Sequence, residues 1–237
     1  MKQLLIAAAL ALLAIGPATA GKPAPKSEGI EAEGYKWNAQ EGEKIEALKL
    51  TGNLENGEEA YEVCGACHLP SGAGRPDGTF PQLAGQHTTV LIKQIADIRA
   101  GLRDNPTMYP FAATLIDPQE LADVAAYIES LCIPNQHGQY DDADKMIQIA
   151  LGRDLYQKQC QECHGANGEG DKDKFYPVIA GQHYKYLLRQ MTEIRDGKRR
   201  NANPDMVKVI KPYTDQQLVA ISAYQASLKM PGQMCQD

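Results

Sequence analysis

Two five-residue segments carry the residues of this chain whose types and spacing could do chemistry: residues 64–68 (CGACH) and 160–164 (CQECH). The pattern Cys-x-x-Cys-His is the attachment sequence of c-type haem. Two thiols add across the two vinyl groups of one porphyrin, and the adjacent imidazole becomes the first axial ligand of the iron. The sequence therefore predicts two covalently bound haem c groups, each with its iron. Their attachment residues are Cys64, Cys67 and His68 in the first copy and Cys160, Cys163 and His164 in the second.

Zinc binding and thiol redox chemistry are the alternative interpretations of paired cysteines. Zinc ribbons commonly separate their two Cys-x-x-Cys pairs by about 15–20 residues, whereas Cys160 follows Cys64 by 96 residues. A thioredoxin-like pair would lie beside a βαβ unit, and no such unit is apparent. Haem attachment is therefore the leading interpretation of both motifs.

Two methionines are the candidates for the second axial ligand of each iron. Met108 and Met206 each end an Asn-Pro-x-Met segment, 40 and 42 residues after the haem histidine of their own copy. A Met thioether opposite a His raises the reduction potential of the iron. The alternatives are that both methionines belong to the core, or that His87 and His183 complete the coordination. Because these two histidines stand where a helix is expected to start, we expect them to cap that helix or to contact a propionate.

Pro81 and Pro177 each lie 13 residues beyond a haem histidine. A backbone carbonyl in that loop is placed to accept the second ring N–H of the histidine. Such outer-shell hydrogen bonds orient the ligands of a metal. We therefore count both prolines among the cofactor-binding residues.

The elements that must position these groups occur twice, mostly at an offset of 96 residues. Each copy has a helix that presents the cysteines, a Pro-x-x-Ala-Gly-Gln-His turn, a helix with an apolar stripe and a last helix with a capping box. The stripes are Leu91, Ile95, Ile98 and Leu102, and Leu187, Met191 and Ile194; the boxes pair Asp117 with Glu120 and Thr214 with Gln217. We predict an all-α fold with two tandem haem domains related by this internal repeat, over residues 51–134 and 135–237.

The start of the chain is typical of a secreted protein. Lys2 precedes an apolar run over residues 4–15, and Ala18-Thr19-Ala20 is a small-x-small cleavage site. We predict a cleaved signal peptide over residues 1–20, a periplasmic mature protein and no transmembrane segment in it. Residues 21–50 form an N-terminal extension or linker, in which Trp37 is a candidate anchor on the first domain. The net charge of −6 gives no basis for a nucleic-acid partner.

Two further features fall outside the haem motifs. Residues 198–200 (KRR) are the densest run of positive charge in the chain, and either dock an acidic partner or form a solvated loop. Cys132 and Cys235 are left over from haem attachment. In an oxidising compartment such cysteines tend to pair, so we predict a Cys132–Cys235 disulfide, with free thiols or a bond to a partner protein as alternatives.

The repeated haem motif, the Ala-Gly-Gln-His turn and the later Asn-Pro-x-Met segment resemble the diheme cytochrome c4 family over residues 51–230. The resemblance implies two class I cytochrome c folds that face each other about a pseudo-twofold axis, with His/Met ligation at both irons and the haem edges close together. It also implies electron shuttling in the periplasm, often towards a terminal oxidase. Leu69 departs from the family pattern, because a glycine usually follows the first haem histidine, and residues 21–50 are longer than is typical.

The predicted function is that of an electron carrier, not an enzyme. The protein would take electrons from a quinol-oxidising complex or a dehydrogenase and deliver them to a terminal oxidase or reductase, so its partners are redox proteins, some of them membrane-bound. The first alternative is an electron-transfer subunit of a sulfide or thiosulfate dehydrogenase, as similar diheme chains are. The second is an enzyme with an open haem site, which two well-placed methionines argue against.

Overall fold

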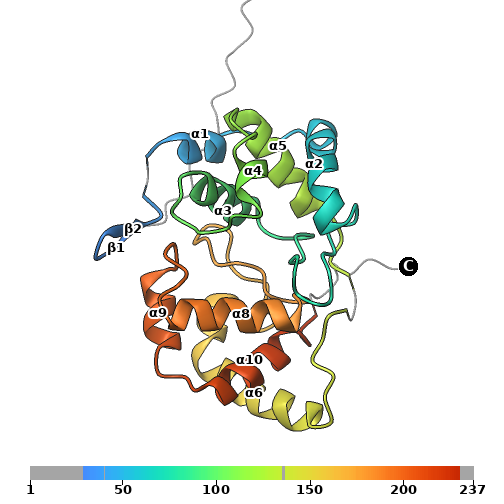
Figure 1. Cartoon of the computed structure of the whole chain (residues 1–237), viewed down its shortest axis with the longest axis vertical. Helices are drawn as coiled ribbons and strands as arrows, with labels where there is room; N and C mark the ends of the chain where they lie inside the picture. Colours follow the sequence, from blue (N-terminus) through green and yellow to red (C-terminus); the bar gives the residue numbers. More distant parts are fainter. Residues whose placement is uncertain (1–28, 40, 135–136, 230–237) are drawn as a thin grey trace, which may run out of the picture.

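The computed structural model describes residues 29–39, 41–134 and 137–229. Within these ranges the chain forms two helical halves, one above the other in Figure 1, with a short strand hairpin at the level where they meet. The predicted signal peptide, Met230, Met234 and Cys235 lie outside the described residues. Among the residues described, no helix combines the length and the apolar composition that a bilayer span requires.

The first half contains the helices that follow the extension. They are α2 (Leu54–His68), α3 (Thr88–Arg99), α4 (Tyr109–Ala112) and α5 (Pro118–Ser130). Helix α5 packs on both α2 and α3. The capping box predicted at the start of α5 is wrong. The Asp117 carboxylate accepts the backbone N–H of Gln119 at 2.9 Å, so the cap is an aspartate cap and not the expected box with Glu120.

The second half repeats this arrangement. Its helices are α6 (Lys145–Gln159), α7 (Gln161–His164), α8 (Tyr184–Arg195), α9 (Pro204–Ile210) and α10 (Asp215–Gln225). Helix α10 packs on α6 and α8, as α5 packs on α2 and α3. The predicted capping box is confirmed here: Thr214 and Gln217 satisfy each other's backbone N–H groups.

A glycine permits the tightest helix crossing in each half. A Cβ atom on Gly57 of α2 would lie 2.2 Å from the carbonyl oxygen of Asp123 on α5, and one on Gly152 of α6 would lie 2.0 Å from that of Ala220 on α10. These glycines are 95 residues apart, whereas the motif cysteines are 96 apart. The second copy therefore has one extra residue before its first cysteine, where the break at Cys160 separates α6 from α7.

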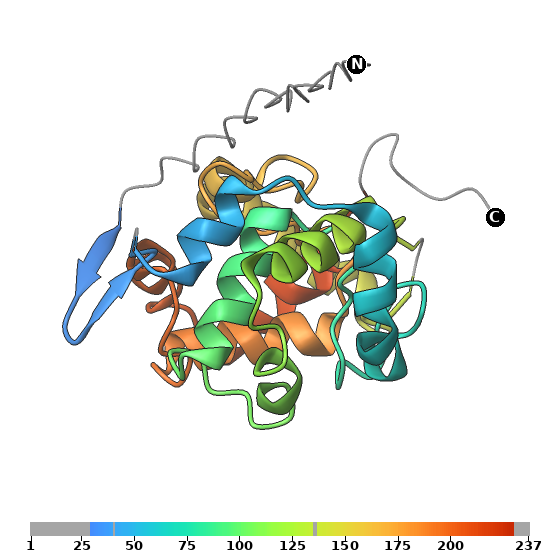
Figure 2. The ribbon, with the colours of Figure 1, turned by 90° about the horizontal axis from the view of Figure 1, so that it is seen from above.

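The extension holds a strand hairpin that the sequence did not predict, followed by a short helix that falls within residues 40–50, where the sequence favours one. Strands β1 (Ile30–Ala32) and β2 (Tyr35–Trp37) form an antiparallel hairpin in which Ile30 faces Trp37. Helix α1 (Glu43–Lys49) follows and packs on α3 and α5. The anchor role of Trp37 is confirmed: its side chain is buried in the core of the first half. Figure 2 shows the hairpin projecting at one side of the two halves.

Candidate haem sites

The first haem motif lies at the C-terminal end of α2. The spacing of Cys64, Cys67 and His68 along one helix, at positions i, i+3 and i+4, brings the three side chains to one face. Cys64 and His68 are buried. Leu69 ends the helix with a φ of 67°, a left-handed conformation that a glycine adopts without strain. The hydroxyl of Tyr61 donates to the Leu69 carbonyl at 2.9 Å, which holds this end of the helix.

The second haem motif has the same spacing, but Cys160 stands at the junction of α6 and α7 while Cys163 and His164 lie on α7. Cys160 and His164 are buried, and Cys163 is partly buried. Here Gly165 occupies the left-handed position, with a φ of 78°, and the Tyr156 hydroxyl donates to its carbonyl at 2.7 Å. The second copy thus has the residue that this conformation favours, and the first copy does not.

Each haem histidine meets the predicted proline carbonyl. Nδ1 of His68 lies 2.9 Å from the carbonyl oxygen of Pro81, and Nδ1 of His164 lies 3.2 Å from that of Pro177. Because a carbonyl only accepts, Nδ1 carries the proton and Nε2 is left with its lone pair for iron. Burial lowers the pKa of both histidines, which keeps the rings in the neutral form that a metal needs.

The thiols are in an environment that suits haem attachment better than thiol redox chemistry. Burial raises the pKa of Cys64 to about 11 and that of Cys160 to about 12. Reactive redox cysteines instead have lowered pKa values in electropositive, partly exposed surroundings. The zinc alternative gains no support either, since the described residues contain no cluster of three or more His, Cys, Asp or Glu side chains that could hold a metal ion.

All ten predicted site residues line one cavity of about 990 Å³ that the two halves share. Apolar side chains of α3 and α8 supply much of its wall, among them Leu91, Ile95, Leu187 and Ile194. Met108 and Met206 line it too and pack against the cores of their own halves. Met191 is buried in the second core as expected, whereas Met146 is exposed.

The polar wall of the cavity fits the propionates of haem. Two arginines related by the repeat meet the same two glutamines: Arg103 donates to Gln94 at 2.8 Å and to Gln190 at 3.1 Å, and Arg199 donates to both at 3.0 Å. Burial, and then the charge of Arg103, lowers the pKa of Arg199 to about 10. Among the described residues, neither guanidinium forms an ion pair with a carboxylate. Partly buried cations without an anionic partner suit the carboxylates that a haem carries.

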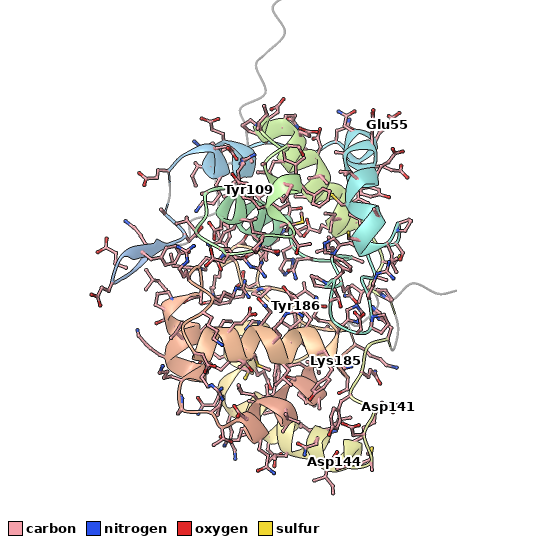
Figure 3. All side chains as sticks on the ribbon, in the orientation of Figure 1. Glu55, Tyr109, Asp141, Asp144, Lys185 and Tyr186 are labelled. Atoms are coloured by element: carbon pink, nitrogen blue, oxygen red, sulfur yellow. The ribbon has the colours of Figure 1, made fainter. Side chains whose placement is uncertain are left out.

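Tyr186 belongs to the same polar wall. Figure 3 labels it on α8, between the two halves. Its hydroxyl accepts from Arg103 at 3.1 Å, and the nearby Arg103 and Arg199 charges lower its pKa although burial acts against them. The site therefore offers thiols, imidazoles, thioethers, an apolar pocket and cationic groups to a porphyrin on each side of the interface.

Comparison with known proteins decides which family this arrangement belongs to. The family model described as Cytochrome c matches residues 54–132 and 149–229. Cytochrome c4 of Azotobacter vinelandii is 32% identical over 191 residues, which cover 73% of this chain and 88% of that protein. This chain belongs to the cytochrome c4 family.

Two further relatives agree with this membership. The crystal structure of reduced recombinant cytochrome c4 from Pseudomonas stutzeri matches with a TM-score of 0.66 and 31% identity, covering 76% of this chain and 100% of that one. A thiosulfate dehydrogenase electron acceptor of Stutzerimonas stutzeri (strain A1501) is 33% identical over 176 residues, which cover 71% of this chain and 80% of that protein. This cytochrome therefore has two class I cytochrome c domains, binds two covalent haem c groups and transfers electrons.

His87 and His183 join the two domains of this cytochrome. Their side chains make no helix-capping hydrogen bond and do not line the haem cavity, so neither capping nor bis-histidine ligation describes them. Nε2 of His87 lies 2.8 Å from the carbonyl oxygen of Glu169, and Nε2 of His183 lies 2.9 Å from that of Ala73. Each histidine thus contacts the opposite domain at positions related by the repeat, as a pseudo-twofold axis requires.

The basic run at residues 198–200 also serves the interface. Arg199 takes part in the glutamine network, and Arg200 binds Asp104 of the first domain through two nitrogens, at 2.6 and 3.0 Å. The interpretation as a solvated loop is therefore wrong for Arg199, whereas the Arg200 side chain stays 55% exposed while it binds Asp104. Docking of an acidic partner by this run stays a prediction. The sequence signal that was available is the repeat itself, because Arg103 aligns with Arg199.

The structure describes only one of the two cysteines of the predicted disulfide. Cys132 takes part in a disulfide, while Cys235 lies outside the described residues, so the Cys132–Cys235 pairing stays a prediction.

Proposed function

We propose that this cytochrome relays electrons in the periplasm between a quinol-oxidising complex or a dehydrogenase and a terminal oxidase or reductase. The observation that carries the proposal is the single cavity lined by both haem motifs. Two haems held by the motifs of this one cavity would lie close enough for electrons to pass from one to the other. The protein then accepts an electron at one domain and delivers it from the other, with residues 51–134 and 135–237 as the two haem domains.

The residue roles follow from the contacts at each site. We assign the thioether bonds to Cys64, Cys67, Cys160 and Cys163. The residues that would bind the iron are those already paired by the repeat, which are His68 and Met108 in the first domain and His164 and Met206 in the second. Pro81 and Pro177 hold the histidine rings through their carbonyl groups.

The haem iron supplies reversible one-electron chemistry, and the protein sets its potential and its access. The Met thioethers favour the ferrous state and raise the potential. The apolar side chains of α3 and α8 exclude water from the pocket. Arg103 and Arg199 would offset the negative charge of haem propionates in this cavity, which would lower the cost of burying those carboxylates.

A second candidate function is electron acceptance from a thiosulfate-oxidising enzyme. A relative that is 33% identical is named as a thiosulfate dehydrogenase electron acceptor. The haem chemistry is the same in both cases, and only the donor differs. Reduction of the purified cytochrome by a thiosulfate dehydrogenase, tested beside reduction by a quinol-oxidising complex, distinguishes the two donors.

A carbon monoxide difference spectrum of the reduced holoprotein tests whether the irons are closed. We expect no binding in the wild type and binding at one haem in each of Met108→Ala and Met206→Ala, because each variant opens one axial position. Rapid binding to the wild type would contradict the relay. It would favour an enzyme with an open haem site, to be tested for peroxide or sulfur-compound turnover.

A further inference from the structure

The N-terminal hairpin joins both haem domains, although it lies outside the repeat. Its strand β1 contacts α9 of the second domain. Trp37 of β2 is 5% exposed and packs in the core of the first domain. Asn38, directly after β2, accepts a hydrogen bond from Lys44 of α1 at 3.0 Å, which ties the hairpin to the helix that packs on α3 and α5. The hairpin is therefore fixed to the first domain and reaches the second.

An aromatic pair crosses the interface at this point. The rings of Trp37 and Phe175 meet edge to face, with centroids 6.4 Å apart and an angle of 84° between their planes. Phe175 belongs to the second domain, yet its buried ring packs in the core of the first. Its φ is 61°, and a bulky residue in this region marks a strained backbone that its surroundings must hold in place.

The contact breaks the pseudo-twofold symmetry of the interface. The residue related to Phe175 by the repeat offset is Thr79 of the first domain, which is exposed. The glutamine and histidine contacts occur in both directions, whereas the contact between Trp37 and Phe175 occurs once. The hairpin and Phe175 thus form an additional link between the domains and do not belong to the repeated interface.

Tyr35 adds a polar contact to this link. Its hydroxyl accepts from Lys93 of the first domain at 3.3 Å and donates to the Asn201 carbonyl of the second at 3.4 Å. Lys93 is 2% exposed and forms a buried ion pair with Asp97. The Lys93 ammonium also lies 5.6 Å from the centre of the Trp37 ring, within the range of a cation–π contact.

The linked residues also form part of the haem cavity wall. Trp37, Lys93 and Phe175 all line the cavity that both haem motifs share. Any change in the separation of the domains at this side would therefore change the space between the two haem sites. The hairpin is part of the chain of the first domain and contacts the second through α9, Asn201 and Phe175, so it adds to the contacts that restrict such changes.

We propose that residues 29–38 act as a clamp that locks the two haem domains together through Trp37, Tyr35 and Phe175, and so sets the rate at which electrons pass between the two haems. Trp37, Tyr35 and Phe175 are positioning residues, because they act through the spacing of the domains. The inference rests on the electron relay proposed above.

Two backbone amides report the state of the interface directly. The N–H of Val178 donates to the side chain of Gln86 at 2.9 Å, and the N–H of Gln82 donates to that of Gln182 at 3.0 Å. Their sequence neighbours donate within their own domains, Ile179 to Gly168 and Leu83 to Gly72. Faster hydrogen exchange at the first pair without a change at the second pair therefore identifies opening of the interface without unfolding.

The experiment measures this exchange and the electron redistribution between the haems after partial photoreduction, on the full holoprotein. Phe175→Asn removes the ring and keeps a residue that tolerates the left-handed conformation. In this variant we expect faster amide hydrogen exchange at Gln82 and Val178. We also expect electrons to redistribute between the two haems several-fold more slowly than in the wild type. Tyr35→Phe, which removes only the hydroxyl, should act in the same direction with a smaller effect.

Two reference variants serve as a positive and a negative control. Gln86→Ala removes a direct interface contact and should speed exchange at Val178. Ile92→Val shortens a buried side chain of α3 that does not line the cavity, and should change neither readout. Unchanged exchange and unchanged redistribution in Phe175→Asn would overturn the clamp. If the wild-type haems exchange no electrons, the relay itself fails, and the amide exchange rates still decide whether the hairpin locks the domains.

Discussion

The side-chain amide of Gln86 binds the backbone of Val178 twice across the domain interface. Its Nε2 donates to the Val178 carbonyl at 2.9 Å, and its Oε1 accepts the Val178 N–H at 2.9 Å. The repeat places the same pair in the opposite direction, where the amide of Gln182 binds the backbone of Gln82 at 2.9 and 3.0 Å. The glutamine and the histidine of the Ala-Gly-Gln-His turn are therefore both residues through which each domain contacts the other.

Gln86→Ala should lower the free energy of unfolding by about 1–3 kcal/mol, since it leaves a buried backbone N–H and carbonyl without partners. Urea unfolding of the holoprotein measures the loss. The matched control is Gln119→Ala, because Gln119 makes its hydrogen bonds to Thr51 and Asp123 within the first domain. A loss of stability in the control together with none in Gln86→Ala would contradict the role of this contact.

The axial ligand assignment predicts separate effects on the two haems. Met108→His replaces a soft thioether by an imidazole and should lower the potential of one haem by on the order of 0.2 V, part of the roughly 0.8 V range that axial ligands cover. Met206→His should lower the potential of the other. A spectroscopic redox titration resolves the two components. Met146→His is the control, since Met146 is 76% exposed on α6 and should shift neither potential.

The difference between Leu69 and Gly165 predicts a stabilising substitution. Leu69→Gly relieves a left-handed conformation that costs about 1–2 kcal/mol, against about 0.5–1 kcal/mol for the greater freedom of glycine in the unfolded chain. The net gain should be about 0.5–1 kcal/mol, measured by thermal unfolding. Gly165→Ala should destabilise, because its φ of 78° strains any residue that has a Cβ atom. A lower melting temperature for Leu69→Gly would show that the leucine packing outweighs the strain.

The haem motifs and the helices around them were predictable because the chemistry and the repeat are both local. Haem attachment needs adjacent residues, so Cys64 and His68 can be read directly from the sequence. The apolar stripe from Leu91 to Ile98 shows the period of a helix, and α3 (Thr88–Arg99) contains it. Leu102, expected on the same stripe, lies beyond the end of α3 and is exposed. The repeat added a second, independent copy of each element, which supported the assignment of Met108 and Met206 as a pair.

The interface could not be predicted, because it depends on which residues meet after both domains have folded. Arg199 stands in an ordinary basic run, and only the structure brings it to Gln94 and Gln190. The hairpin could not be predicted for a different reason. Its strands have three residues each, too short to show alternation, and their stability comes from the packing of Trp37 on both domains.

A buried histidine at the interface predicts that the free energy of unfolding decreases at acidic pH. His183 is fully buried, and burial, followed by the charge of His137, lowers its pKa to about 4, while the Ala73 carbonyl and Asp77 act in the opposite direction. The unfolded chain takes up a proton near pH 6.5, and the folded protein does not until about pH 4. Stability should therefore fall as the pH decreases from about 6.5 to 4, by up to about 1.4 kcal/mol per pH unit for this one proton.

His183→Gln removes the titrating ring and keeps an N–H donor for the Ala73 carbonyl. Its free energy of unfolding should depend less on pH between 6.5 and 4 than that of the wild type, whatever its value at pH 7. Urea unfolding of the holoprotein at several pH values measures this slope, and haem ligation keeps His68 and His164 from contributing to it. His137→Gln should make the wild-type slope shallower as well, because removing the neighbouring charge raises the pKa of His183. Equal slopes in all three proteins would mean that His183 does not titrate in this range.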